Sequence, residues 1–415
     1  MDEKIILNVI RDWNYDYVFK KRKHYSEQIK SLAQSKEVIA LIGVRRSGKS
    51  TLLYQEISNL KKIYDSSQIL FLNFEDPRFS TQLNTSLLDE IFEVYKKNIY
   101  RSGEIFLFLD EIQNIPDWEK WVRTKHELKQ ANIYITGSSA KLLSKELGTV
   151  LTGRCLEVNV FPLSFNEYLE FTNEKKLVKI DSFNSYFEFG GFPKVVNLLS
   201  NKKEELQAYF KNIILRDVVA RYSLKNYHNV EQIAQLLISN VGKLYSANKL
   251  RLAIGISLES ALFYIEALKE SMLFFDLYKF DYSLKKQQLS QKKIYCIDSG
   301  MINTLAFNFS ENKGRVLENL VFIELKRRNK KIYYHKNKFE CDFLIKQGLK
   351  ITEAVQVCYE LTKENKKREL AGLLEAMDEH KLKKGLLLTY DKEEELIFKN
   401  KKIVIMPVWK YLLNE

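Results

Sequence analysis

The feature that most constrains this fold is a glycine-bounded loop, residues 43–50, which lies between an apolar run and a segment of helical character. Its sequence, GVRRSGKS, fits the pattern G-x-x-x-x-G-K-[ST]. The glycines let backbone N–H groups turn toward a polyphosphate without a Cβ clash, and Lys49 supplies a positive charge for the β and γ phosphates. Ser50 supplies a hydroxyl for Mg²⁺, and the helix N-terminus adds partial positive charge. A chance tight turn is the alternative, but the strand before the loop and the helix after it favour phosphate binding.

Two later strands end in polar residues that suit the same chemistry. The apolar run 105–109 is followed by Asp110 and Glu111, the form of a Walker B element. Asp110 would hold Mg²⁺, and Glu111 would orient or deprotonate the attacking water. A strand that begins at residue 132 reaches Thr136 and Ser138, where a polar sensor of the γ-phosphate is expected. The predicted nucleotide-binding residues are therefore Gly43, Val44, Arg45, Arg46, Ser47, Gly48, Lys49, Ser50, Thr51, Thr136 and Ser138.

Two other strands carry charged residues whose role the sequence leaves open. A strand over residues 68–74 ends at Glu75 and Asp76, which either face the nucleotide or belong to a proline-containing turn. A fifth strand begins at Arg154. We expect Arg154 either to contact the γ-phosphate, in its own subunit or a neighbouring one, or to be an exposed cation at the strand entry. The neighbouring-subunit alternative implies a homo-oligomer.

The segment ahead of the first strand is rich in aromatic residues. Trp13, Tyr15, Tyr17 and Phe19 precede a basic run at residues 20–23, and an amphipathic helix follows. Segments in this place often cover the adenine in P-loop ATPases. Arg22 and the aromatic residues are therefore expected either to do so here or to pack against the core.

Composition sets the outer limits. A length of 415 residues predicts two to four domains, and 45% apolar content is ample for packed cores. There is no apolar run of about 18 residues and no signal-peptide pattern, so we expect a soluble cytoplasmic protein that does not span a membrane. The net charge of +13 favours a polyanionic partner, with a lysine-rich solvated surface as the alternative. The four scattered cysteines are expected to be reduced, buried thiols: Cys155, Cys296, Cys341 and Cys358.

The order of the motifs resembles a family of archaeal and bacterial ATPases of the AAA superfamily. After the loop come DE at 110–111, TGSS at 136–139, LTGR at 151–154 and FPLSFNEY at 161–168. The similarity continues through FGGFP at 189–193, LRD at 215–217, KIYCIDSG at 293–300 and ECDF at 340–343, so it covers nearly the whole chain. The resemblance implies ATP and Mg²⁺ as ligands and a five-stranded parallel sheet with the sensor strand between the Walker A and Walker B strands. It also implies a C-terminal domain similar to the PD-(D/E)xK restriction-endonuclease fold.

The middle of the chain is expected to hold a helical lid and a winged-helix-like module. In this class, helices such as those at residues 166–225 cover the nucleotide, so Arg216 or Arg221 could reach its phosphates; a local Arg216–Asp217 ion pair is the favoured alternative. Three helices and two strands over residues 230–297 then follow in the order of a winged helix. The expected recognition helix carries three glutamates and one lysine, which disfavours contact with DNA phosphates. A nucleic-acid contact would use the basic wing: Lys285, Lys286, Lys292 and Lys293.

The C-terminal domain departs from the nuclease pattern. A helix places Glu318 on an apolar face, and Asp342 lies on a following strand. In the endonuclease-like fold these two acids and an E-x-K pair bind a metal ion. The matching positions here are Gln356 and Cys358, while Glu353 points to the opposite face of its strand. We conclude that these four positions mark a metal site that has lost nuclease chemistry.

The sequence thus predicts an α/β, Mg²⁺-dependent ATPase in which hydrolysis drives a conformational switch of the C-terminal modules. Its client is expected to be a nucleic acid or a protein. The alternatives are a non-hydrolysing, nucleotide-gated scaffold and an ATP-dependent nuclease, which Gln356 and Cys358 disfavour. The predicted segments are an N-terminal segment (1–35), a P-loop core (36–165), a helical lid (166–228), a winged-helix-like module (229–300) and a degenerate endonuclease-like domain (301–415).

Overall fold

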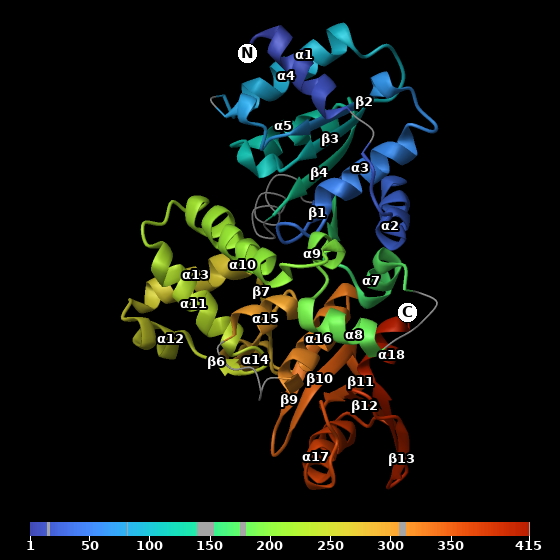
Figure 1. Ribbon diagram of the computed structural model, residues 1–415, viewed down its shortest axis with the longest axis vertical. Coiled ribbons are helices and arrows are strands. Elements are labelled where there is room, and N and C mark those ends of the chain that lie inside the picture. Colours follow the sequence, from blue (N-terminus) through green and yellow to red (C-terminus); the bar gives the residue numbers. More distant parts are fainter. Residues whose placement is uncertain (15–16, 81, 139–152, 175–179, 307–312, 415) are drawn as a thin grey trace. The chain divides into compact units, whose positions relative to one another are not determined.

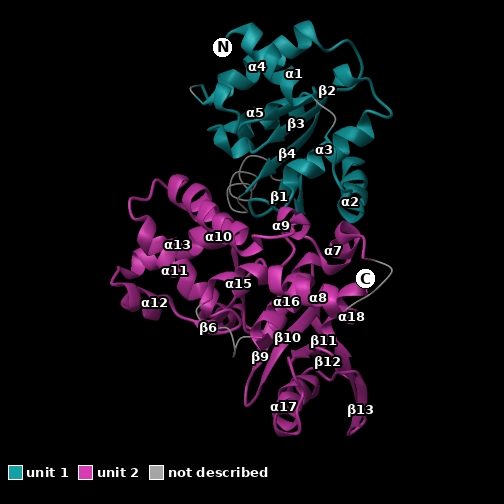
Figure 2. Ribbon diagram, in the orientation of Figure 1, with its two compact units in different colours: residues 1–160, 270–272 teal, residues 161–269, 273–415 magenta. Residues whose placement is uncertain are grey.

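The computed structural model describes residues 1–14, 17–80, 82–138, 153–174, 180–306 and 313–414 (Figure 1). The chain divides into two compact units (Figure 2). Unit 1 comprises Met1–Val160 with Glu270–Met272, and unit 2 comprises Phe161–Lys269 with Leu273–Glu415. The finer division into five segments stays a prediction.

Unit 1 is built on a five-stranded parallel sheet of order β2-β3-β4-β1-β5. Its strands are β1 (Val38–Ile42), β2 (Ile69–Asn73), β3 (Phe106–Asp110), β4 (Asn132–Gly137) and β5 (Cys155–Asn159). Strands β1 and β3 are buried at every position, as expected of a parallel sheet covered on both faces. The sensor strand β4 lies between β3 and β1, which confirms the predicted strand order.

The helices of unit 1 are α1 (Glu3–Trp13), α2 (Lys23–Ala33), α3 (Lys49–Leu60), α4 (Thr85–Asn98) and α5 (Trp118–Glu127), with short 3₁₀ turns at Ser66–Gln68, Pro77–Phe79 and Ile112–Asn114. Trp13 packs against the core, because its ring lies 5.9 Å from that of Phe71 and its indole N–H donates to Asp76 at 2.7 Å. Tyr17 stacks on Tyr54 at 5.0 Å, whereas Tyr15 lies outside the described residues. Trp13 and Tyr17 therefore take the packing role.

Unit 2 opens with the helices α7 (Phe165–Thr172), α8 (Ile180–Phe189), α9 (Pro193–Asn197) and α10 (Lys202–Asn212) and a π-helix (Ile213–Ala220). Two family motifs meet here. The carboxylate of Asp298 accepts the backbone N–H of Gly191 at 2.7 Å and caps α15 (Ser299–Leu305) through Gly300 N. A Cβ on Gly190 would lie 2.0 Å from Asp298, and one on Gly300 would lie 2.2 Å from the carbonyl oxygen of Phe189. The FGGFP and KIYCIDSG motifs thus require glycine because Gly190 packs against the Asp298 carboxylate and Gly300 packs against the backbone of Phe189.

The next part of unit 2 has a three-stranded antiparallel sheet of order β6-β8-β7. Its elements are α11 (Tyr227–Ser239), β6 (Leu244–Tyr245), α12 (Ala247–Ile254), α13 (Leu258–Glu270), β7 (Phe274–Leu277), α14 (Leu284–Leu289) and β8 (Lys292–Cys296). The expected polar loop between β7 and β8 contains the short helix α14, which begins because Ser283 accepts the N–H of Lys286. Assignment of this part to the winged-helix class stays a prediction.

The C-terminal part of unit 2 has a six-stranded mixed sheet of order β13-β14-β12-β11-β10-β9. Its strands are β9 (Lys331–Lys336), β10 (Glu340–Gln347), β11 (Lys350–Val357), β12 (Lys384–Thr389), β13 (Glu394–Phe398) and β14 (Lys401–Pro407). The helices are α16 (Lys313–Arg327), α17 (Lys363–Glu379) and α18 (Val408–Leu413). Helix α17 packs on β10, β11 and β12, and an apolar cluster that includes Leu344, Leu373 and Leu387 fills this contact. The endonuclease-like assignment stays a prediction.

Two further predictions concerned membrane-spanning helices and the state of the cysteines. No helix among the described residues is long and apolar enough to cross a membrane. The four cysteines are free thiols, and three of them are buried, but Cys155 is only half-buried because β5 is the edge strand of its sheet.

Candidate nucleotide-binding site

The loop between β1 and α3 has a backbone that depends on its glycines. Gly48 caps α3 with a φ of 100°, a left-handed conformation that glycine adopts without Cβ strain. A Cβ on Gly43 would lie 2.2 Å from the carbonyl oxygen of Val160, so a larger residue does not fit there. Of the other loop residues, Val44 and Ser47 are buried, Arg45, Ser50 and Thr51 are half-buried, and Arg46 is exposed with a φ of 71°. The loop therefore lies at the carboxyl end of β1, where the sequence predicts it.

Lys49 and Glu111 face each other at this edge of the sheet. Lys49 Nζ donates to the carbonyl oxygens of Gly43 at 3.0 Å and Val44 at 3.4 Å, and it lies 3.6 Å from Glu111 Oε1. Glu111 follows β3 with a left-handed φ of 54°, and its carboxylate accepts a hydrogen bond from Gln113. Both charged side chains are buried. The structure thus brings together the cation and the acid that were predicted from separate motifs.

Asp110, the last residue of β3, is the centre of a buried polar network. Its Oδ1 accepts hydrogen bonds from Ser50 Oγ at 3.0 Å and Thr136 Oγ1 at 2.6 Å, and its Oδ2 accepts one from Asn73 Nδ2 at 3.2 Å. The Thr136 hydroxyl also accepts the backbone N–H of Glu111 at 2.8 Å. Burial, and next the adjacent Glu111, raise the pKa of Asp110 to about 6. The predicted sensor threonine is therefore bonded to both residues of the Walker B element.

Two further residues contact this site: Asn73, which was not predicted there, and Arg22, for which packing was one of two predicted alternatives. Asn73 ends β2 and pairs in register with Asp110, so its position at the carboxyl end of a neighbouring strand was the available signal. Arg22 is buried, and its guanidinium donates to the carbonyl oxygen of Ser47 at 3.0 Å while lying over the ring of Tyr25. Arg22 thus contacts the loop itself, which is a packing role rather than a demonstrated adenine contact.

The two acids after β2 have different roles. Glu75 forms an ion pair with Arg45 of the loop at 2.7 Å. Asp76 accepts hydrogen bonds from Arg78 and Trp13, and the Arg78 guanidinium is the main cause that lowers the pKa of Asp76 to about 2. Asp76 therefore belongs to the turn, as one alternative predicted, whereas Glu75 contacts the loop.

The donor set fits a magnesium nucleotide. Ser50 Oγ and the Asp110 carboxylate supply the oxygen ligands that Mg²⁺ prefers, and Lys49 with the N-terminus of α3 supplies positive charge for phosphates. Ser47 Oγ is buried and has no hydrogen-bond partner among the described residues, so it can donate to a phosphate oxygen. Ser138 is buried just beyond β4. A nucleotide with its metal ion would therefore be held by residues of four elements: the loop, α3, β3 and β4.

Arg154 lies at the opposite end of the sheet from the loop. Its carbonyl oxygen accepts the N–H of Val38, the first residue of β1, whereas the loop follows the last residue, Ile42. The five-residue strand between them spans about 16 Å. The guanidinium is partly exposed and pairs with Glu127 at 3.0 Å. The prediction that Arg154 reads the γ-phosphate of its own subunit is therefore wrong; it is a strand-entry cation, and action in a neighbouring subunit stays a prediction.

This position gives a test. We expect Arg154→Ala to change the ATP hydrolysis rate of a non-assembled chain by no more than roughly twofold, the size of a surface-substitution effect. Arg123→Ala is the matched control, because Arg123 also pairs with Glu127, at 2.9 Å. Steady-state turnover of both variants checks this. A large loss that recovers when Arg154→Ala protein is mixed with Lys49→Ala protein would instead assign Arg154 to a neighbouring subunit.

The lid arginines lie in unit 2. Asp217 is buried in the π-helix, and Arg221 Nη2 lies 3.9 Å from its carboxylate, one helical turn further on. Arg216 is exposed. The local ion pair thus uses Arg221 in addition to, or in place of, the predicted Arg216, and contact of either arginine with phosphates stays a prediction.

The four lysines predicted as a basic wing do not share one surface. Lys285 and Lys286 are exposed on α14, while Lys292 pairs with Asp276 at 3.3 Å. Lys293 is buried, with 2% of its side chain exposed. Alternate residues of a strand face opposite sides, and Lys293 shares the inward face of β8 with Tyr295. The prediction that Lys293 contributes to a nucleic-acid surface is therefore wrong.

Lys293 instead lies among the acids predicted to mark a former metal site. Its Nζ is 3.0 Å from Glu318 Oε1, 3.1 Å from Asp342 Oδ1 and 2.9 Å from Glu340 Oε1. Tyr295 donates its hydroxyl to Glu318. Burial and then Glu318 raise the pKa of Asp342 to about 7, while the surrounding acids outweigh burial and hold the pKa of Lys293 well above its ordinary value. Glu318 and Asp342 are thus brought together, with an ammonium group between them.

The positions that replace the E-x-K pair extend this network. Gln356 accepts the backbone N–H of Asp342 at 3.3 Å and donates to Glu369 at 2.9 Å. Cys358 is a buried thiol, and burial raises its pKa to about 12. Neither side chain supplies an anionic ligand or a cationic group at neutral pH; the loss of metal-dependent chemistry stays a prediction.

The fold and the loop define an AAA-type nucleotide-binding domain, and residues 35–169 match the family described as AAA domain. The chain is 36% identical to the uncharacterized protein MJ1544 of Methanocaldococcus jannaschii, over 100% of this chain and 96% of that protein. It is 31% identical to an uncharacterized protein of Haemophilus influenzae, over 87% of this chain and 91% of that protein. The chain therefore belongs to a family of AAA-domain proteins that includes these two relatives.

Two further matches are less informative. Residues 180–312 match a domain of unknown function (DUF8612), and this region crosses the predicted boundaries at 228 and 300. The solved structure of C. elegans PCH-2 is 15% identical, over 66% of this chain and 72% of that chain, with a TM-score of 0.26. At that level of similarity nothing is transferred from it.

Proposed function

We propose that this protein hydrolyses ATP in a Mg²⁺-dependent reaction. The observation that carries the proposal is the convergence of Lys49, Asp110 and Glu111 at one edge of the parallel sheet. Lys49 would bind the β and γ phosphates, Ser50 and Asp110 would hold Mg²⁺, and Glu111 would orient the attacking water or accept its proton. The metal ion supplies neutralisation of the charge that develops on the phosphates.

Hydrolysis is proposed to act as a switch. Thr136 bonds to Asp110 and to the Glu111 backbone, so a change of its hydrogen bonds on loss of the γ-phosphate would be transmitted to the end of β3. The client would be a nucleic acid or a protein, and the net charge of +13 supports a polyanionic one. Action of Arg154 across a subunit boundary would require a homo-oligomer.

Nuclease chemistry is not part of the proposal. Lys293 lies within 3.1 Å of both Glu318 and Asp342 and offsets the negative charge that would attract a divalent metal ion. Gln356 and Cys358 stand where an acid and a lysine are needed to activate water.

The proposed function is tested by ATP turnover and by Lys49→Ala. Loss of one charged hydrogen-bonding group costs about 1.5–3 kcal/mol, so we expect this variant to bind ATP roughly 10- to 100-fold more weakly. Lys62→Ala is the matched control, because Lys62 is exposed just beyond α3, and it should bind ATP as the wild type does. Calorimetric titration gives the affinities, and phosphate release with and without EDTA gives the metal dependence. Wild-type protein that binds ATP but never releases phosphate would favour the nucleotide-gated scaffold.

A further inference from the structure

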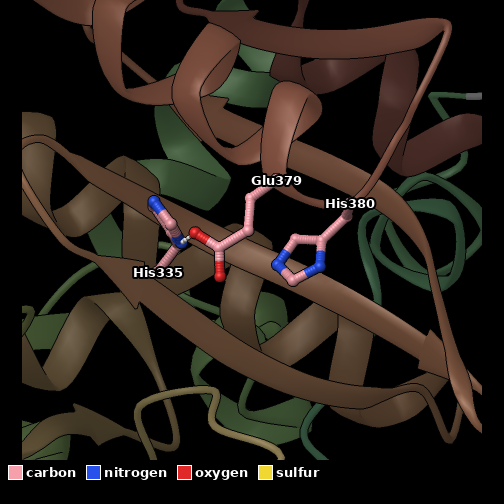
Figure 3. A group of neighbouring side chains, drawn as sticks. All are labelled: His335, Glu379 and His380. Carbon is pink, nitrogen blue, oxygen red and sulfur yellow. Dashed lines mark ion pairs between the residues drawn. The ribbon is translucent and has the colours of Figure 1, made fainter.

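Three side chains in unit 2 place two imidazoles and a carboxylate around one point (Figure 3). His335 belongs to β9, Glu379 is the last residue of α17, and His380 follows it. One ligand atom of each residue lies within 4.8 Å of the other two, and the Glu379 carboxylate lies between the two rings. None of the three belongs to the nucleotide-binding site or to the cluster around Lys293.

His335 is held in one orientation by its other ring nitrogen. Nε2 lies 2.9 Å from Oε1 of Glu375, and this carboxylate also accepts the backbone N–H groups of Lys338 and Phe339, at 3.2 Å and 3.3 Å. An ionised acceptor keeps the ring proton on Nε2, which leaves the lone pair on Nδ1. Nδ1 faces Glu379, with an Nδ1–Oε2 distance of 3.9 Å. A carboxylate behind one ring nitrogen is the usual arrangement of a histidine that binds a metal ion through the other.

The ring nitrogens of His380 make no hydrogen bond within the described part of the chain. Both nitrogens are buried, and neither has a hydrogen-bond partner there. The ring packs edge-on against Phe280, with 5.1 Å between centroids, and lies 6.2 Å from the ring of His335. A buried polar group without a partner is destabilising, so this ring is expected to have a partner that is not protein.

We propose that His335, Glu379 and His380 bind one Zn²⁺ ion. Two imidazoles and one carboxylate suit Zn²⁺, whereas Mg²⁺ prefers oxygen ligands only. Zinc–ligand distances near 2.1 Å place tetrahedral ligand atoms about 3.4 Å apart, so side-chain shifts of about 1 Å close the set. Asn337 already holds Glu379, because its amide donates to Oε2 at 2.6 Å. The ion would join the C-terminal end of α17 to β9 and leave a coordination position for water.

The proposal is tested on full-length, nucleotide-free protein that has been treated with a chelator and then titrated with Zn²⁺. We expect each chain to bind one equivalent of Zn²⁺ and this binding to require His335 and His380. His335→Gln and His380→Gln should each lose that equivalent, whereas His228→Gln, an exposed histidine of α11, should keep it. Titration with Co²⁺ should give visible absorption bands of a nitrogen-ligated, low-coordinate ion in wild type and in His228→Gln but not in the other two variants.

Glu375→Gln separates metal binding from folding. It removes no proposed ligand and nearly preserves side-chain shape, so it remains informative if His380→Gln fails to fold. Loss of a group that orients a metal-binding histidine typically weakens metal affinity by 10- to 100-fold, and we expect that range here. Equal Zn²⁺ stoichiometry and equal Co²⁺ spectra in wild type and His380→Gln would overturn the proposal. An unchanged Zn²⁺ affinity in Glu375→Gln would overturn the assigned role of His335 Nδ1.

Discussion

Glu111→Gln is expected to slow ATP hydrolysis by about 10²- to 10⁴-fold, the usual contribution of a general base, while ATP binding is retained. The amide keeps the shape of the carboxylate but cannot accept a proton from water. Binding should persist because Lys49 and the loop backbone, rather than Glu111, are expected to hold the phosphates. Single-turnover hydrolysis and equilibrium ATP binding, measured on the same protein, separate the two effects.

The matched control for this prediction is Glu93→Gln, which removes an exposed carboxylate from α4 of the same unit. It should turn over ATP at the wild-type rate. Equal rates for wild type and Glu111→Gln would remove Glu111 from the catalytic role. A parallel loss of ATP affinity in Glu111→Gln would instead indicate that the carboxylate mainly positions Lys49.

The nucleotide-binding site could be predicted from the sequence because its residues sit at strand ends. In a parallel sheet the carboxyl ends of neighbouring strands share one edge, so Asp110 and Thr136, which end adjacent strands, had to lie close together. Asn73 followed the same rule. The same reasoning disfavours contact between Arg154 and the γ-phosphate bound by its own subunit, because Arg154 precedes β5 and therefore lies at the amino edge of the sheet.

Unit 2 was less predictable because its polar residues meet through long-range contacts. Lys293 and Glu318 come from a strand and a helix, and Asp342 comes from a strand of a different sheet. Alternation places Lys293 and Tyr295 on one face of β8, but two polar residues at alternate positions ordinarily indicate a solvent-facing side, so the strand itself gave no signal that Lys293 is buried. His335 and His380 are likewise distant in sequence and meet only because α17 ends beside β9. Spacing motifs do not encode such contacts.

Lys293→Met is expected to lower the free energy of unfolding of unit 2 by about 3–5 kcal/mol, the usual cost of removing one partner of a buried ion pair. Methionine keeps the length and apolar stem of the side chain but leaves the carboxylates of Glu318 and Asp342 buried without a counter-charge. Native-state hydrogen exchange of the unit 2 amides, measured in Lys293→Met and in wild type, gives the difference.

The pH dependence and a control distinguish this electrostatic effect from simple misfit. Without Lys293, burial should raise the pKa of Asp342 above its wild-type value of about 7, so Asp342 should take up a proton at a higher pH in Lys293→Met than in wild type. The deficit of Lys293→Met should therefore shrink as pH falls from the raised pKa of the variant toward about 7, below which both proteins carry this proton. Lys285→Met, at an exposed position of α14, should stay within about 0.5 kcal/mol of wild type. A pH-independent deficit would point to packing alone. If wild-type protein cuts DNA with Mg²⁺ or Mn²⁺ and either Lys293→Met or Asp342→Ala abolishes cutting, the cluster would be a working metal site, and its interpretation as a structural ion network would be wrong.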